Sequence, residues 1–169
     1  MTVATRPRRS PARRPQRGFS LVELVVVLAI MGLLASICFP LAELARRRNQ
    51  EEQLRRSLGE IRLALDDYKR LVDGGRIANP LGGSGYPPTL DVLVQGVTDL
   101  QSPQGARIFV LRRLPRDPLA PDASAPAART WGLRSYASDP DEPRSGADVF
   151  DIYSLAPGKG LDGTPYRTW

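Results

Sequence analysis

The longest run of apolar residues lies near the start of the chain. From Phe19 to Leu41 the sequence reads FSLVELVVVLAIMGLLASICFPL, and its polar positions are Ser20, Glu23 and Ser36. A helix rises about 1.5 Å per residue, so a run of this length crosses a bilayer core of about 30 Å. The pattern therefore predicts a transmembrane helix over residues 19–41.

A second pattern follows directly and has the period of a helix with one apolar face. Apolar residues recur at spacings of three and four, with charged residues on the other faces, at Leu54, Leu58, Ile61, Leu65, Tyr68 and Val72. This periodicity predicts that the helix continues over residues 42–73 as an amphipathic segment, packed on the rest of the chain. The run Asp73-Gly74-Gly75 predicts its end. We expect Arg62 with Asp66, and Asp66 with Arg70, to form solvated charge pairs on its surface.

Residues 74–169 have the composition of a loop-rich domain. They hold 12 of the 15 glycines and 12 of the 16 prolines, and eight aromatic residues that can close a small core. Three short stretches have the pattern of strands, at 107–111, 133–137 and 149–155. The chain as a whole predicts an α+β fold: a long N-terminal helix, transmembrane in its first half, packed on a small antiparallel β-sheet with long loops.

The residue types exclude several kinds of chemistry. The chain has no histidine, which excludes His-dependent triads and His-ligated zinc sites. It has one cysteine, which excludes an internal disulfide framework and any CxxC pair. No enzyme motif is found in the remainder, so we expect a protein that is not an enzyme.

Positive charge is concentrated at the N-terminus. The net charge is +6, from 24 basic and 18 acidic residues, and the first 18 residues hold six arginines and no acid. Without them 18 basic residues (24 − 6) face 18 acidic ones, so the body is neutral. A basic leader before an apolar run indicates a cytoplasmic N-terminus and an exported C-terminal part, rather than a nucleic-acid-binding surface.

Glu23 is the unusual position in the apolar run. A carboxylate at mid-bilayer costs about 2.5–3.5 kcal/mol by insertion scales. Its presence has two explanations from the residues alone. Either the side chain lies shallow enough to reach the interface, or it has a function within the membrane.

The string Arg17-Gly18-Phe19-Ser20-Leu21-Val22-Glu23, between a basic leader and an apolar run, resembles the signal of type IV prepilins and type II secretion pseudopilins. The resemblance implies that a prepilin peptidase cuts between Gly18 and Phe19, removes the leader 1–18 and methylates the Phe19 amine. It also implies that Glu23 serves assembly. A carboxylate on one subunit can neutralise the Phe19 ammonium of its neighbour in a low-dielectric setting.

Two further positions fit the same family. Gly32 and Pro40 fall where many pilins loosen their helix in the filament. Glycine lowers helix stability and proline removes a backbone donor, so both explanations remain open here: helix flexibility used in assembly, or a plain kink.

The C-terminal part narrows the resemblance to the major pseudopilins of type II secretion. The similar blocks are Tyr86-Pro87-Pro88, Leu114 to Pro118, Trp131 to Tyr136 and Phe150 to Leu155. The resemblance implies a single-pass protein of the bacterial inner membrane, whose residues 74–169 form a periplasmic domain. It implies as partners a prepilin peptidase, other copies of the chain, minor pseudopilins and an inner-membrane assembly platform. The subunits would form a pseudopilus that drives protein export.

Calcium is a candidate cofactor through the same resemblance, because major pseudopilins commonly have a calcium loop after this last block. The weak candidates here are Leu155 and Asp162, since Asp162 is the one carboxylate in the loop and Lys159 adds a repulsive charge. A hard cation needs six to eight oxygens. A simple glycine-rich turn is the alternative.

Two other functions stay open. One is a type IV pilin or minor pilin for adhesion, motility or DNA uptake, which shares the N-terminal features. The other is a membrane-tethered periplasmic domain that does not assemble, for which Glu23 would be dispensable.

Overall fold

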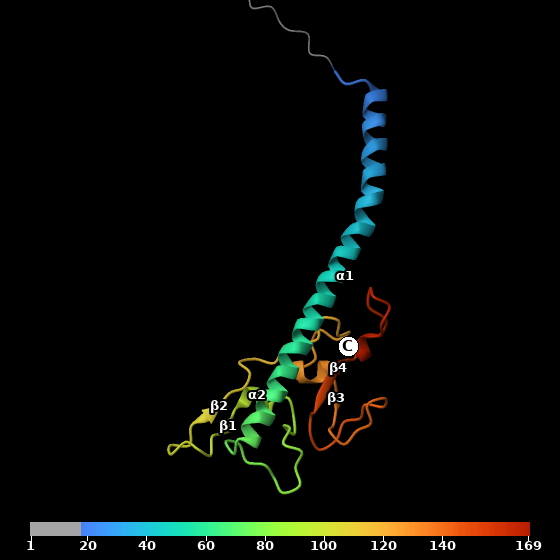
Figure 1. Ribbon diagram of the computed structural model, residues 1–169. Coiled ribbons are helices and arrows are strands. Elements are labelled where there is room, and N and C mark those ends of the chain that lie inside the picture. The colour runs from blue at the N-terminus through green and yellow to red at the C-terminus, as the bar shows by residue number, and fades with distance from the viewer. Residues whose placement is uncertain (1–17) are drawn as a thin grey trace, which may run out of the picture. The chain divides into compact units, whose positions relative to one another are not determined.

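The computed structural model describes residues 18–169, which belong to two compact units: one ends at Glu43 and the other is Leu44–Trp169. Helix α1, Leu21–Asp73, contributes to both and is drawn from blue to green in Figure 1. The predicted leader lies outside the described residues, apart from Gly18.

The first unit consists of the N-terminal part of α1. Its large apolar side chains face outward: Leu21 is 77% exposed, Met31 61% and Phe39 74%. Among the described residues, α1 is the one helix long and apolar enough to span a membrane, and none of its most apolar 18-residue window is buried. Nothing among residues 18–169 covers this apolar surface, as expected of a helix whose solvent is lipid.

The second part of α1 supplies one side of a hydrophobic core. All six residues of the predicted apolar stripe are buried, and Leu54, Ile61 and Leu65 are completely inaccessible. They pack with apolar residues of the C-terminal domain, which include Leu90, Leu93, Trp131, Val149 and Ile152. The prediction of an amphipathic helix packed on its own domain is confirmed.

Helix α1 ends at Asp73, where the glycine pair predicted it to end. The Gly75 N–H donates to the Val72 carbonyl and the Arg76 N–H to the Leu71 carbonyl, both at 2.9 Å. Gly75 has φ +69°, which permits this left-handed turn. The turn directs Ile77, which is buried, back against the core.

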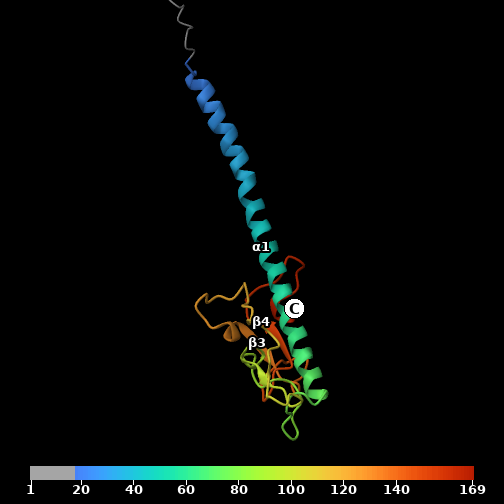
Figure 2. The ribbon, with the colours of Figure 1, turned by 90° about the vertical axis from the view of Figure 1, so that its left-hand side faces the viewer.

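Two antiparallel strand pairs follow, each beside the C-terminal part of α1 (Figures 1 and 2). After the short helix α2, Val92–Gln95, strand β1, Val97–Thr98, pairs with β2, Arg107–Ile108. Strand β3, Trp131–Arg134, pairs with β4, Asp151–Ser154. A one-turn 3₁₀ helix, η1 (Ala127–Thr130), directly precedes β3. A second one, η2 (Tyr166–Thr168), follows β4 and the loop after it.

The α+β class is confirmed, but the expectation of one sheet is wrong in detail. There are two separate two-stranded sheets among the described residues, and β1 was not predicted. The predicted strand at 107–111 stops at Ile108, because the N–H groups of Val110 and Leu111 both donate to the Leu93 carbonyl of α2. β3 begins before the predicted 133–137 and ends at Arg134, since the next N–H, that of Ser135, donates to Arg144 in a loop.

Candidate functional site

The N-terminal end of α1 carries the residues singled out for processing. Gly18, Phe19 and Ser20 have no regular structure, and α1 begins at Leu21. The first helical hydrogen bond runs from the Leu24 N–H to the Ser20 carbonyl, at 3.1 Å. Phe19 is 83% exposed. The peptide bond between Gly18 and Phe19 therefore lies outside the hydrogen-bonded helix, in backbone that can enter an active site without unwinding a helix.

Glu23 lies in the first turn of α1 and is exposed. Its neighbours Leu21, Val22 and Leu24 are exposed apolar residues. Between residues 18 and 169 no hydrogen bond or ion pair engages its carboxylate. A negative group in the first turn is favourable toward the helix dipole.

The helix between Gly32 and Pro40 is weakened at three points. Gly32 has no side chain, and a Cβ built on it would meet no other group within 4 Å. The Ser36 hydroxyl donates to the Gly32 carbonyl at 2.9 Å, which competes with the helical hydrogen bond. Pro40 lies inside α1 and has no N–H to donate. This composition lowers the cost of opening α1 locally.

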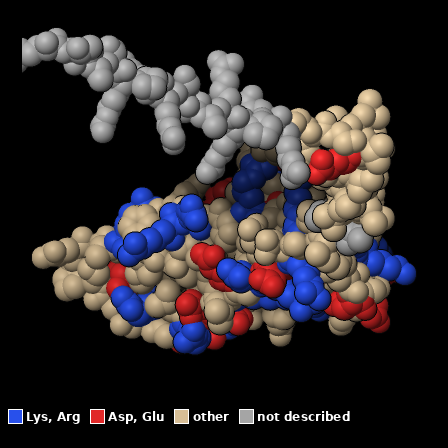
Figure 3. Space-filling model, turned by 90° about the horizontal axis from the view of Figure 1, so that it is seen from above, with Lys and Arg blue, Asp and Glu red and all other residues tan. Residues whose placement is uncertain are grey.

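The face of the molecule in Figure 3 carries charges of both signs. Lysine and arginine lie among aspartate and glutamate there, without forming a single basic surface. This distribution agrees with the neutral body expected from the sequence.

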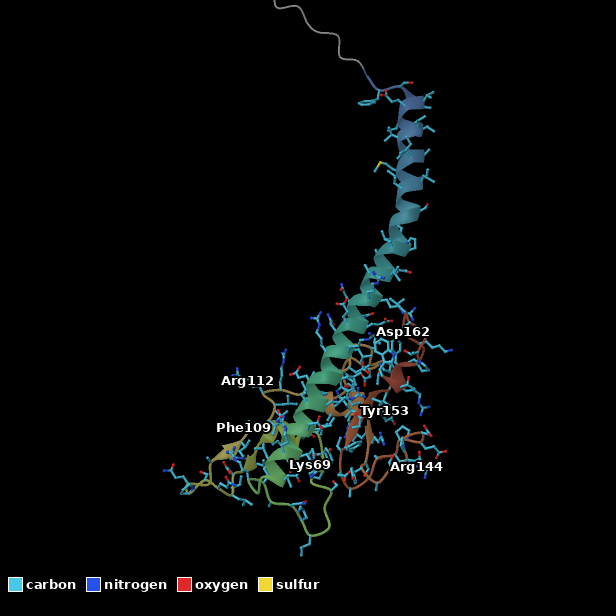
Figure 4. The ribbon with its side chains drawn as sticks, in the orientation of Figure 1. Lys69, Phe109, Arg112, Arg144, Tyr153 and Asp162 are labelled. Atoms are coloured by element: carbon cyan, nitrogen blue, oxygen red, sulfur yellow. The ribbon has the colours of Figure 1, made fainter. Side chains whose placement is uncertain are left out.

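A group of hydrogen-bonded polar side chains lies where the chain after β4 meets α1. We call residues 156–165 the C-terminal loop, and Figure 4 labels Asp162 within it. One Asp162 oxygen accepts from the Thr164 N–H at 3.0 Å and from the Thr164 hydroxyl at 2.6 Å. The other accepts from Arg55 of α1 at 2.9 Å. The Thr164 hydroxyl and N–H, with Arg55 nearby, hold the pKa of Asp162 below its usual value.

Glu51, one helical turn before Arg55 on α1, also contacts the C-terminal loop. Its side chain accepts from the Leu161 N–H at 3.0 Å and from the Tyr166 hydroxyl at 2.8 Å. Arg47 lies 3.4 Å from the same oxygen and also donates to the Lys159 carbonyl. Burial, together with the Glu51 carboxylate, raises the pKa of Tyr166. Both carboxylates of this region are thus occupied by internal donors.

The residues of the C-terminal loop do not fit the calcium site that the resemblance implied. Asp162 is shared between Arg55 and Thr164, and Leu155, 51% exposed, follows directly on β4. Over residues 18–169 no group of three or more acidic, His or Cys side chains is placed to hold a metal ion. A divalent cation would compete with Arg55 and Thr164 for Asp162, and it would find no second carboxylate in the loop.

Arg62 is an organising residue that the sequence interpretation missed. Its expected partner was Asp66 on the same helix. Instead the guanidinium donates to Asp151 of β4 at 2.8 Å, to the Ile152 carbonyl at 3.1 Å and to the Trp169 carbonyl at 2.7 Å. Arg70 likewise pairs with Asp67 rather than Asp66. The one sequence feature that could have indicated a structural role for Arg62 is its place next to the buried Ile61. Its partners could not be predicted, because they lie about 90 and 107 positions away along the chain.

The four blocks noted in the sequence of residues 74–169 pack against one another. Tyr86 and Phe150 form an edge-to-face pair with ring centroids 5.0 Å apart, and Tyr136 lies 5.5 Å from Phe150. The Val149 N–H donates to the Pro87 carbonyl at 2.8 Å, and the Trp131 indole N–H donates to Pro115 at 2.9 Å. The blocks are therefore the framework that surrounds the core.

Comparison with known proteins finds similarity in both regions. Residues 13–39 match the family model of the prokaryotic N-terminal methylation motif. The chain is 32% identical over 155 residues to the type II secretion system core protein G of Aeromonas hydrophila, and this match covers 89% of this chain and 87% of that protein. It is 33% identical over 114 residues to the core protein G of Klebsiella michiganensis, covering 65% of this chain and 72% of that one.

A shorter stretch of the chain is similar to a fimbrial protein. It is 35% identical over 81 residues to a type IV major fimbrial protein, FimA, of Dichelobacter nodosus, which covers 43% of this chain and 49% of the fimbrial protein. No solved structure matches the chain.

Proposed function

This chain belongs to the type II secretion system core protein G family of pseudopilins, and from that premise we propose how it is processed and assembled. The observation that carries the function is the extent of the similarity, which reaches 87% of the length of the Aeromonas protein. The protein is thus a membrane-anchored pseudopilin. Its work is mechanical: subunits polymerise into a periplasmic pseudopilus that drives protein export across the outer membrane.

In the proposed processing step, a prepilin peptidase cuts between Gly18 and Phe19 and methylates the new amine. Support comes from the matched methylation motif and from the exposed, non-helical backbone at Gly18 to Ser20. Removal of the leader 1–18 leaves residues 19–41, which include the first part of α1, in the inner membrane. Its N-terminus faces the cytoplasm and residues 42–169 lie in the periplasm.

In the proposed assembly step, Glu23 of one subunit pairs with the Phe19 ammonium of a neighbour. The pair would repay the cost of Glu23 in the membrane, about 2.5–3.5 kcal/mol by insertion scales. Two unit charges about 4 Å apart attract by about 4 kcal/mol at an effective dielectric constant of about 20. Because the pair forms only at one stagger of the two helices, it also sets the register of the fibre. Other copies, minor pseudopilins and the inner-membrane assembly platform are the partners.

The weakened stretch between Gly32 and Pro40 serves the same step. Subunits leave lipid and pack their helices on one another, which requires α1 to adapt to its neighbours. Local opening costs less where a donor is missing and a side-chain hydroxyl competes for a carbonyl. We assign this stretch to helix flexibility during assembly.

The first experiment is the intact mass and N-terminal sequence of the protein from membranes, in cells with and without the prepilin peptidase. We expect a mature chain that begins at methylated Phe19 only when the peptidase is present. An intact N-terminus in peptidase-positive cells would overturn the processing step.

The second experiment compares Glu23→Ala with Glu43→Ala, a matched change at another exposed acid of α1. Glu23→Ala should abolish pseudopilus formation and protein export while membrane levels stay normal, and Glu43→Ala should preserve both. Full function of Glu23→Ala would favour a tethered domain that does not assemble. A deletion strain that exports normally but loses surface fibres would favour a type IV pilin, the alternative to which the shorter fimbrial match points.

A further inference from the structure

Several backbone oxygens of the C-terminal loop accept hydrogen bonds from N–H groups nearby in the chain. The Thr164 carbonyl accepts from the Gly160 N–H at 2.7 Å, and the Gly160 carbonyl accepts from the Gly163 N–H at 2.9 Å. The Gly158 carbonyl accepts from the Tyr166 N–H at 3.4 Å. A hard cation gathers six to eight such oxygens around itself. Here these three carbonyls instead accept from N–H groups of the loop and of Tyr166.

Two further acceptors of the loop are taken by cations from α1. Arg47 donates to the Lys159 carbonyl, and Arg55 donates to Asp162 at 2.9 Å. These residues are two helical turns apart and lie on one face of α1, with Glu51 between them. Glu51 accepts from the loop at Leu161, so the helix face alternates cation, anion and cation against complementary groups of the loop.

Arg55 is also fixed by an aromatic ring. Its guanidinium carbon lies 4.3 Å from the centroid of the Trp169 ring, and the Trp169 indole N–H donates to the Thr164 hydroxyl at 2.6 Å. A guanidinium stacks on an aromatic face while its edge donates to a carboxylate, which an ammonium or a spherical ion cannot do. Arg55 therefore joins three parts of the chain: α1, the Asp162 turn and Trp169.

We propose that Arg47 and Arg55 of α1 are the built-in cations of the C-terminal loop, so that the loop folds and stays docked on α1 without any divalent metal ion. The anionic side chain at the turn is neutralised from within the chain, and the Gly158, Gly160 and Thr164 carbonyls accept from N–H donors. The inference concerns the folding of the second unit. It holds whichever kind of fibre the subunit builds.

The test uses the full chain in detergent micelles, with unfolding followed by tryptophan fluorescence. The thermal midpoint is measured with EDTA and with calcium chloride at about 5 mM, above the dissociation constants of about 10⁻⁴–10⁻³ M typical of extracellular calcium sites. We expect the same midpoint in both conditions and no heat of binding in a calcium titration. A midpoint that rises with calcium would overturn the proposal.

The cationic role of Arg55 is tested by Arg55→Gln against Arg56→Gln. Arg56 is the next residue on the same helix, its side chain is 77% exposed, and its ion pair is a surface contact with Glu52 at 3.3 Å. Because the Arg55 pair is itself partly exposed, we expect Arg55→Gln to lower the midpoint by about 2–4 °C relative to Arg56→Gln. It should also change the emission of Trp169. Equal midpoints and spectra for the two variants would remove Arg55 from the proposal.

Discussion

Ser154 donates a hydrogen bond of 2.5 Å to Asp117, 37 positions earlier in the chain. Ser154 is completely inaccessible and Asp117 is 3% exposed. The second Asp117 oxygen accepts from the Leu119 N–H at 2.7 Å, and the Ser154 hydroxyl also accepts from the Ala156 N–H at 3.1 Å. The loop before η1 is thereby tied to β4 in the interior of the domain.

Removal of the Asp117 carboxylate should destabilise the domain. Asp117→Ala leaves the buried Ser154 hydroxyl and the Leu119 N–H without their acceptor, and an unsatisfied buried polar group costs about 1–3 kcal/mol. Urea unfolding of the full chain measures the loss. Asp141→Ala, at an exposed acid, is the control and should change stability by less than about 0.5 kcal/mol. Equal effects of the two changes would contradict the role given to Asp117.

Two leucines of α1, Leu65 and Leu63, test which face of the helix packs in the core. Leu65 is completely inaccessible, whereas Leu63 is 65% exposed. Leu65→Ala should cost about 2–5 kcal/mol, because it removes buried methyl groups and leaves a cavity. Leu63→Ala should be close to neutral in the isolated subunit. The measurement is again urea unfolding, and a large effect of Leu63→Ala in that assay would argue against the packing seen here.

Two glycines should respond to alanine with opposite signs. Gly132 of β3 pairs with Tyr153 of β4, and a Cβ at Gly132 would overlap the Tyr153 ring. Gly132→Ala should therefore destabilise the domain by about 1–3 kcal/mol through overpacking. Gly59 lies within α1, where a Cβ would meet nothing within 4 Å. Gly59→Ala should stabilise the protein by about 0.5–1 kcal/mol, since alanine favours the helix.

The two variants are compared by thermal unfolding, and only the direction in which each midpoint moves from that of the natural chain matters. Midpoints that move in opposite directions agree with the structure. A stabilising Gly132→Ala would mean that β3 and β4 do not pair in the register Gly132 to Tyr153.

Acid should weaken the domain through Asp99. Arg76 donates to the Asp99 carboxylate and the Gln101 N–H donates to it at 3.1 Å, and these contacts hold the pKa of Asp99 below its usual value despite burial. The unfolded chain therefore takes up a proton at a higher pH than the folded one. The stabilisation is complete above the ordinary pKa of about 3.9 and is lost as the pH falls through the lower folded-state value.

Urea unfolding at a series of pH values checks this dependence. We expect stability to fall below about pH 4, and we expect Asp99→Asn to flatten that fall while it lowers stability at neutral pH. Asp141→Asn should leave the profile of the natural chain unchanged. An identical acid profile for Asp99→Asn and the natural chain would contradict the prediction.

The sequence by itself determined the parts of this protein that depend on neighbours along the chain. The period of Leu54, Ile61 and Leu65 identified the buried face of α1, and Gly74 with Gly75 identified its end, because helix geometry relates residues three and four positions apart. The N-terminal methylation motif could also be recognised from the sequence, because it lies within one short segment, residues 13–39. The resemblance of four separate blocks identified the family.

Only the tertiary structure decided which distant residues meet. Arg62 faces Asp151 rather than Asp66, Asp117 reaches Ser154, and the loop that resembled a calcium site is closed by Arg55. No periodicity encodes these pairs, because a loop of almost any length can bring its ends together at a cost that grows slowly with length. Where a side chain has two chemically reasonable partners, the packing of the domain decides which one it contacts. That packing forms only when α1, the loops and both strand pairs enclose one core.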